Sequence, residues 1–410
     1  MRKIYLDHNA TTPVSQEVLD AVLPLFKEGF GNPSSVHSEG RAARVRLDES
    51  REQVAGLIGA KPSEMVFTSG GSESNNFAIL GTAFALGNKK RHIVTCEVEH
   101  AAILNPLKQL EGMGFHIERL PVDSVGRVDP ERVKNALTEK TLLVTIQHAN
   151  SEVGTLQNIG RIGEYTHQKG ILFHTDAVQS VGKVPVDVRN LPVDLLSMSS
   201  HKIYGPKGVG ALFIRRGTPA LFSPVCGGGQ ENKRRGGTEN VPGIVGFGKA
   251  CQLAKERMTR GEVERLIEMR DQLWERIEQS VTGAELFGCS DNRLPNTLGC
   301  GFEGADGDTL LIALDMEGIS VSTGSACSSG TGMPSPVLSA MRVPVEKINS
   351  SLRFSLGWGN TLSDMDRVVE TLARAVQQSR DKSLATPKTG FIERLRPKKM
   401  FLGEICQKPE

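Results

Sequence analysis

Short apolar runs rich in β-branched residues alternate with helical patterns from about residue 15 to residue 250. The runs predict buried strands, and the stretches between them predict helices. The predicted strands are residues 65–68, 92–97, 116–120, 142–146, 171–175 and 211–215, and the predicted helices include 42–58, 130–137 and 159–169. Because strands and helices alternate, we expect an α/β fold with a mostly parallel sheet and helices on both faces.

The pattern changes after residue 255. Leu266, Met269, Leu273 and Ile277 form one apolar stripe, which predicts a long amphipathic helix over residues 255–281. Further strands are predicted at 297–301 and 352–356, with a last helix at 364–382. We therefore predict a large domain at 15–255, a smaller α+β domain made of 1–14 together with 256–385, and a C-terminal tail at 386–410.

Composition narrows the function classes. The chain has 410 residues and a net charge of +2, which gives no electrostatic case for a nucleic-acid or membrane partner. No window approaches the ~18 apolar residues of a membrane span, and the N-terminus lacks the apolar stretch of a secretory signal. The seven cysteines are scattered singly, without a C-x-x-C pair, which argues against disulfides or a zinc site. We expect a cytoplasmic protein.

Lys202 is the first candidate for chemistry. It follows an apolar segment that ends at Met198 and lies between hydroxyl, imidazole and glycine neighbours. Desolvation at a sheet edge favours the neutral form of a lysine amine, which can form a Schiff base. The alternative is a surface lysine whose stem lies along apolar neighbours.

A second candidate is the turn Ser69-Gly70-Gly71-Ser72, where a predicted strand leads into an apolar helical pattern. Small residues let backbone N–H groups approach an anion, and the helix N-terminus adds a favourable dipole. The turn could therefore hold a phosphate. A helix capped by a serine would have the same sequence.

His100 follows the predicted strand 92–97, and Asp176 ends the strand predicted at 171–175. The imidazole could stack on a planar cofactor or move protons, and the alternative is a helix cap. The carboxylate could keep a pyridine nitrogen protonated, with Gln179 reaching the phenolic oxygen of pyridoxal phosphate; the alternative is an N-cap. The order phosphate loop, histidine, aspartate, lysine is harder to obtain by chance than any one member.

With these motifs, the chain closely resembles the cysteine desulfurases of the class V aminotransferase family, which are fold type I pyridoxal-phosphate enzymes. The matching motifs are residues 5–13, Gly31-Asn32-Pro33-Ser34-Ser35, 67–74, 176–180, 199–208, Arg235-Gly236-Gly237-Thr238, Gly324-Ser325-Ala326-Cys327 and 353–357. The resemblance implies a large domain with a mostly parallel seven-stranded sheet. The Ser-x-Gly-Ser-Ala-Cys loop is similar to the long-loop group that serves iron–sulfur assembly and nitrogen fixation.

The resemblance also implies site roles. Lys202 would bind the cofactor covalently, Asp176 would pair with its pyridinium, His100 would stack on its ring, and Gln179 would bond its phenolic oxygen. The phosphate would be held by Gly71, Ser72, Ser199, His201 and, from the neighbouring subunit of a homodimer, Thr238. Arg353 with Asn32 would bind the carboxylate of L-cysteine, for which a guanidinium is well suited. Many relatives carry Asn-Asn-Glu where this chain has Asn150-Ser151-Glu152, so neither of the first two positions is included.

Cys327 completes the predicted chemistry. Residues 322–335 hold five serines and three glycines around it, a composition that predicts an exposed thiol on a mobile loop. By resemblance, Cys327 would take sulfur from L-cysteine as a persulfide, leave alanine, and pass the sulfur to acceptor proteins such as an iron–sulfur scaffold. His100 would serve as acid and base for the thiol protons. No intrinsic metal site is expected, and Cys327 would be at most a transient ligand of a partner's cluster.

Other functions remain open at this point. A selenocysteine lyase or a related β-eliminating lyase would share every cofactor residue. A transaminase of the same fold would need no mobile thiol, and a catalytically silent docking subunit would not need Lys202, Asp176 and Arg353. Substrate preference and the colour of the purified protein separate these alternatives.

Overall fold

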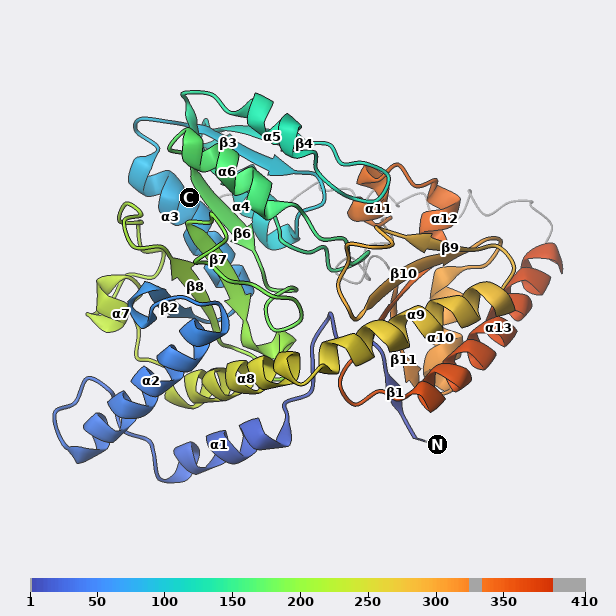
Figure 1. Ribbon diagram of the computed structural model, residues 1–410, viewed down its shortest axis with the longest axis horizontal. Coiled ribbons are helices and arrows are strands. Elements are labelled where there is room, and N and C mark those ends of the chain that lie inside the picture. Colours follow the sequence, from blue (N-terminus) through green and yellow to red (C-terminus); the bar gives the residue numbers. More distant parts are fainter. Residues whose placement is uncertain (1, 324–333, 386–410) are drawn as a thin grey trace, which may run out of the picture.

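The computed structural model describes residues 2–323 and 334–385. Its largest sheet has seven strands and can be followed in Figure 1. The strand order is β2-β8-β7-β6-β5-β3-β4, and the pairs β7–β6, β6–β5, β5–β3 and β3–β4 are all parallel. Only β8 runs antiparallel to both of its neighbours, β2 and β7. The bounds are β2 Met65–Thr68, β3 His92–Cys96, β4 His116–Leu120, β5 Thr141–Thr145, β6 Leu172–Asp176, β7 Leu195–Ser199 and β8 Gly210–Ile214. The predicted α/β fold with a mostly parallel sheet is confirmed.

Helices cover both faces of this sheet. On one face, α3 and α4 pack with Ile93, Ile117 and Leu143. On the other face, α2, α5, α6 and α8 pack with Val94, Val144 and other strand residues in the largest apolar cluster. The bounds are α2 Ser38–Leu57, α3 Gly71–Leu86, α4 Ala101–Gly112, α5 Pro130–Ala136, α6 Ile159–Gln168 and α8 Val241–Thr259. Alternate residues of the parallel strands are therefore buried on opposite faces.

A second apolar cluster surrounds a four-stranded antiparallel sheet of order β12-β13-β10-β9. The bounds are β9 Ala284–Phe287, β10 Thr297–Phe302, β12 Ser322–Thr323, β13 Ser351–Ser355, α9 Glu262–Ser280, α10 Gly307–Met316 and α13 Leu362–Ala385. The N-terminal strand β1 (Ile4–Tyr5) pairs in parallel with β11 (Ile319–Ser320), and Ile4 and Leu6 are buried in this second cluster. The predicted domain limits stay a prediction, and α8 continues past residue 255.

The remaining elements lie between or beside these two groups. They are α1 Gln16–Lys27, α7 Gln230–Lys233, α11 Pro336–Ala340, α12 Val345–Asn349, and the short helices η1 Pro62–Glu64 and η2 Ser200–Lys202. The predicted tail, 386–410, lies outside the described residues. In the part of the chain that the structure describes, every helix is too short or too polar to cross a lipid bilayer.

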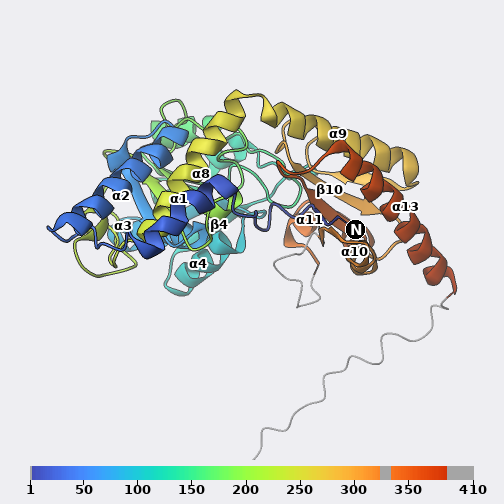
Figure 2. The ribbon, with the colours of Figure 1, turned by 90° about the horizontal axis from the view of Figure 1, so that it is seen from below.

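The single long helix predicted over residues 255–281 is wrong. Two helices, α8 and α9, meet here, as Figure 2 shows. The first packs with the seven-stranded sheet and the second with the four-stranded sheet. Gly261, the N-cap of α9, has a φ of 76°, a left-handed conformation that interrupts the helical hydrogen bonds. The apolar stripe itself was predicted well, because Leu266, Met269, Leu273 and Ile277 are all buried along α9.

Candidate active site

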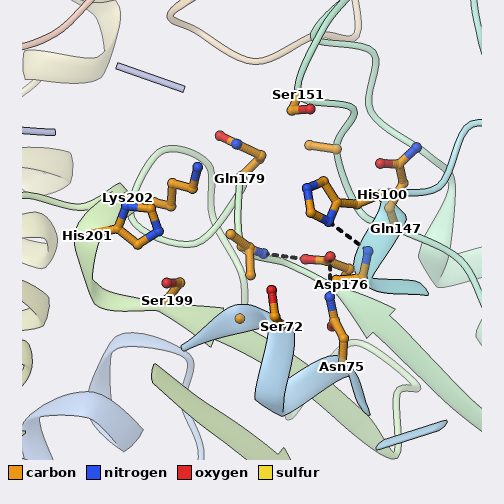
Figure 3. Close-up of a pocket in the computed structure, with 14 residues that line it drawn as sticks. Ser72, Asn75, His100, Gln147, Ser151, Asp176, Gln179, Ser199, His201 and Lys202 are labelled. Carbon is orange, nitrogen blue, oxygen red and sulfur yellow. Dashed lines mark hydrogen bonds between the residues drawn. The ribbon is translucent and has the colours of Figure 1, made fainter. Parts of the chain in front are cut away.

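The residues predicted to bind a cofactor converge on one cavity of about 250 Å³ at the edge where the parallel strands β5, β6 and β7 end (Figure 3). Ligands of open α/β sheets bind at this edge. Of the predicted residues, the cavity is lined by Gly71, Ser72, His100, Asp176, Gln179, Ser199, His201 and Lys202. Parallel pairing brings together groups that are far apart in the sequence.

The first turn of α3 forms one wall of the cavity. Gly70 has a φ of 153°, and a Cβ at Gly71 would come within 2.7 Å of the Val178 side chain, so the turn requires these glycines. Ser72 lies in the same turn, and the neighbouring Ser199 has a buried Oγ with no hydrogen-bond partner among the described residues. A helix N-terminus beside an unpaired hydroxyl fits an anionic group such as a phosphate.

Asp176 is the last residue of β6, at the strand end where it was predicted. Its Oδ2 accepts a hydrogen bond of 2.7 Å from Nδ2 of Asn75, and its Oδ1 accepts one of 3.0 Å from the backbone N–H of Val178. Two donors on opposite oxygens fix the carboxylate beside the cavity, and further lone pairs can accept a ring N–H. Sequence reasoning missed Asn75, although its place one helical turn after Ser72 puts it on the same face of α3.

His100 is both a helix cap and a cavity residue. It is the N-cap of α4, where its Nδ1 accepts a hydrogen bond of 3.0 Å from the backbone N–H of Ala102. Because Nδ1 accepts, the proton of a neutral imidazole is on Nε2. The two interpretations drawn from the sequence were alternatives, and the geometry is compatible with both.

Lys202 ends the short helix η2 directly after β7. Its Nζ donates to the backbone carbonyl oxygens of Asn9, at 2.5 Å, and Ala10, at 2.8 Å. The same Asn9 oxygen accepts from the Gln179 amide at 3.0 Å. The N-terminal segment therefore passes directly over the amine. Asn9 belongs to a motif that the sequence analysis noted without giving it a role.

Lys183 is a buried residue that sequence reasoning also missed. Its Nζ donates to the side-chain oxygens of Gln179, at 3.0 Å, and Asn9, at 3.2 Å. Burial, followed by the positive charges of Lys202 and Arg353, lowers the pKa of Lys183 to about 7. The side chain of Gln179 is thus held between Lys183 and the Asn9 backbone.

His201 carries no positive charge at neutral pH. Burial lowers its pKa to about 4, and the nearby Lys202, Lys207 and Lys183 add to the shift. The ring Nδ1 lies 3.1 Å from Oγ1 of Thr11. His201 can therefore contribute a hydrogen bond to an anion, but not a full charge.

Three predicted residues do not line this cavity. Arg353, on β13, is buried and donates from Nη2 to Asp7 at 2.7 Å and from Nη1 to the Ser151 carbonyl at 3.3 Å, so it reaches the wall through Ser151. Asn32 lies between α1 and α2, and Thr238 is exposed ahead of α8. Their roles stay predictions.

The cysteines of the described residues offer one exposed thiol, that of Cys226, which does not line the cavity. Burial raises the pKa of Cys96, Cys251 and Cys300, so none of these three is a thiolate at neutral pH. Cys289 is buried as well. The predicted nucleophile, Cys327, lies outside the described residues.

Taken together, the lining groups fit pyridoxal phosphate. A helix N-terminus with an unpaired hydroxyl suits the phosphate, a fixed carboxylate suits the pyridine nitrogen, and an amine suits the aldehyde. Figure 3 shows Lys202 and Asp176 on opposite sides of the cavity, with Ser72 and Ser199 between them on its floor.

The sheet under the cavity gives a testable pH dependence. His174, on β6, is fully buried between Thr145, at 2.8 Å from Nδ1, and Ser197, at 3.0 Å from Nε2. Burial lowers its pKa from 6.5 to about 3. The unfolded chain therefore binds a proton that the folded chain excludes, and stability is lost as pH falls from 6.5 toward 3.

We expect wild-type protein to lose about 2 kcal/mol more unfolding free energy than His174→Gln between pH 6.5 and pH 5. Denaturant unfolding at the two pH values measures this difference. An equal loss in both proteins would show that His174 does not contribute to the pH dependence.

Comparison with known proteins identifies the family of the chain. Residues 4–368 match the model of the family described as aminotransferase class-V. The chain is 50% identical over 379 residues to a protein named cysteine desulfurase IscS from Dictyoglomus turgidum, covering 92% of this chain and 96% of the relative. A solved structure titled NifS-like protein is 36% identical with a TM-score of 0.86, covering 92% of this chain and all of the other. Another, titled SspA in complex with cysteine, is 37% identical with a TM-score of 0.76, covering 87% and 99%.

Proposed function

Because the chain belongs to the class V aminotransferase family, we propose that it is a pyridoxal-phosphate-dependent cysteine desulfurase that converts L-cysteine to L-alanine. The observation that carries this proposal is the single cavity that collects Lys202, Asp176, His100 and the phosphate-binding turn. The named activity of the relative at 50% identity gives the substrate.

Different residues of the cavity bind different parts of the cofactor. The first turn of α3, with Ser72, Ser199 and His201, holds the phosphate, and Asp176 accepts the N–H of the ring. Asn75 keeps Asp176 in place through its 2.7 Å hydrogen bond. When bound, pyridoxal phosphate supplies an electron sink for the charge left on Cα after proton loss.

Two side chains move protons during the reaction. Lys202, at the end of η2, takes the proton from the substrate Cα, and its amine must leave the carbonyls of Asn9 and Ala10 to do so. His100 offers its Nε2 as the acid and base for the thiol protons. Both groups line the same cavity.

Sulfur leaves on Cys327. Its thiolate forms an S–S bond with the substrate sulfur while the substrate C–S bond breaks. The Cys327 thiol and L-cysteine thereby become a Cys327 persulfide and L-alanine, so the atoms balance without an external oxidant. The elevated pKa values of buried Cys96, Cys251 and Cys300 support this choice of nucleophile over those thiols.

The active unit is a homodimer in this proposal, with Thr238 completing the phosphate site of the neighbouring subunit. This arrangement is supported by the exposure of Thr238, which does not line the cavity of its own subunit. Arg353 with Asn32 binds the substrate carboxylate. The buried Nε of Arg353 has no hydrogen-bond partner among the described residues, which leaves one N–H for this contact. The sulfur acceptor is an iron–sulfur scaffold protein in the cytoplasm.

Product analysis tests the function. Purified holoenzyme given L-cysteine should form alanine, with one persulfide per Cys327 before an acceptor or reductant is added. A selenocysteine lyase, which the named relatives do not favour, would act on selenocysteine and leave L-cysteine unchanged. Absence of alanine from L-cysteine, in protein that carries the cofactor, would refute the proposal.

A further inference from the structure

Two histidines and a glutamate gather at the open edge of the seven-stranded sheet. His92 begins β3 and His116 begins β4, and the two residues are direct partners in the parallel register. Glu118 follows two residues after His116, so it lies on the same face of β4. One ligand atom from each of the three side chains lies within 4.8 Å of the others.

The geometry of the two rings favours a shared ligand. The imidazoles are stacked, with centroids 5.0 Å apart and an angle of 23° between their planes. The Nε2 of His92 is 3.2 Å from a carboxylate oxygen of Glu118. Further along the same face, Val94 and Leu120 belong to the apolar core, so the polar group is confined to the beginning of the two strands.

The buried histidine is oriented by a second contact. His92 is 5% exposed, and its Nδ1 lies 2.9 Å from Oγ1 of Thr141, which also accepts the backbone N–H of Thr138 at 2.8 Å. In the tautomer whose Nδ1–H donates to Thr141, the lone pair of His92 is on Nε2. That atom is buried, and its 3.2 Å contact with Glu118 does not have the geometry of a hydrogen bond. Metal-binding histidines are oriented in this way by a partner on their other nitrogen.

A lone pair on Nε2 facing a carboxylate at 3.2 Å is repulsive unless a cation lies between them. A proton on Nε2 would not be shared with that oxygen, because the contact lacks the geometry of a hydrogen bond. Two imidazoles and one carboxylate are a ligand set of Zn²⁺.

We propose that His92, His116 and Glu118 bind Zn²⁺ at the open edge of the seven-stranded sheet. Ligand atoms around tetrahedral zinc are ~3.3 Å apart, so the exposed His116 and half-exposed Glu118 rotate inward to complete the site. Water fills the fourth position. The ion links β4, the last strand in the sheet order, to β3. The spacing along the sequence gives no sign of this site, because the parallel register alone brings the ligands together.

Zinc titration of the holoenzyme by calorimetry tests the proposal. The parent protein carries Cys327→Ala, which removes a competing thiolate. His116→Ala and Glu118→Gln should each weaken Zn²⁺ binding at least about tenfold and abolish the rise in melting temperature that Zn²⁺ gives the parent. The control is His167→Ala. His167 lies on α6, with its Nε2 3.4 Å from Asp194, and among the described residues it belongs to no group of three possible metal ligands. The His167→Ala protein should therefore bind Zn²⁺ as tightly as the parent.

The outcomes separate clearly. Unchanged zinc affinity in both His116→Ala and Glu118→Gln would overturn the site, as would zinc binding that is present in wild type and absent in the Cys327→Ala parent. Both ligand variants lie at the surface and away from the cavity, so in a Cys327-containing chain they should keep wild-type alanine formation. His92→Gln, checked for folding by its zinc-free melting temperature, should also lose binding.

Discussion

Lys202→Ala is expected to lower alanine formation from L-cysteine by about 10⁴-fold or more. The variant loses both the amine that would bind the cofactor aldehyde and the base that moves the Cα proton. It also loses the two hydrogen bonds to the Asn9 and Ala10 carbonyls, at 2.5 and 2.8 Å. Alanine assays and the visible absorption spectrum of the purified protein measure the two effects together.

Lys255→Ala is the matched control. The exposed Lys255 also donates its amine to a backbone carbonyl, that of Gly56, but it lies on α8 away from the cavity. It should keep full activity and the wild-type colour. Turnover by Lys202→Ala at the wild-type rate would remove the basis for the proposed site.

Cys327→Ala is expected to retain the cofactor spectrum of wild type while sulfide and alanine formation fall at least about 100-fold. Cofactor retention follows because every proposed cofactor contact is made by other residues. The loss follows because no other thiol of the described residues lines the cavity. Sulfide released in the presence of a reductant measures sulfur transfer, and the absorption spectrum of the same samples measures cofactor binding.

The matched control is Cys226→Ala, which removes the exposed thiol of the described residues. The Sγ of Cys226 lies 3.7 Å from the Ser223 carbonyl and outside the cavity lining, so this variant should work at the wild-type rate. If Cys226→Ala lost activity and Cys327→Ala kept it, the assignment of the sulfur-accepting thiol would be reversed.

The sequence predicted the fold and the cavity to different extents. Short apolar runs located β2 and β4 without error, because β2 is buried throughout and β4 buries Ile117 and Leu120. It missed the break at Gly261, because the apolar stripe begins only at Leu266 and gives no information on residues 255–261. A single glycine within a helical pattern is not enough to predict where two helices meet.

The candidate site shows the same limit. Asp176 ends a strand, and Lys202 and His100 closely follow strands, so their place at one sheet edge could be predicted from the alternating pattern. Asn75 and Lys183 could not be, because their roles depend on which buried partner each side chain reaches. An asparagine on a helix gives no local signal that it binds an aspartate from a distant strand.

The course of the N-terminal segment has a mechanical consequence. Residues 4–6 are anchored in the second apolar cluster, whereas the carbonyls of Asn9 and Ala10 grip the amine beside the large sheet. Any hinge motion that separates the two sheets must stretch this short tether or release the amine. The lysine that starts the reaction is therefore clamped by chain from the opposite half of the molecule, and its readiness to react depends on how closely the two halves are held.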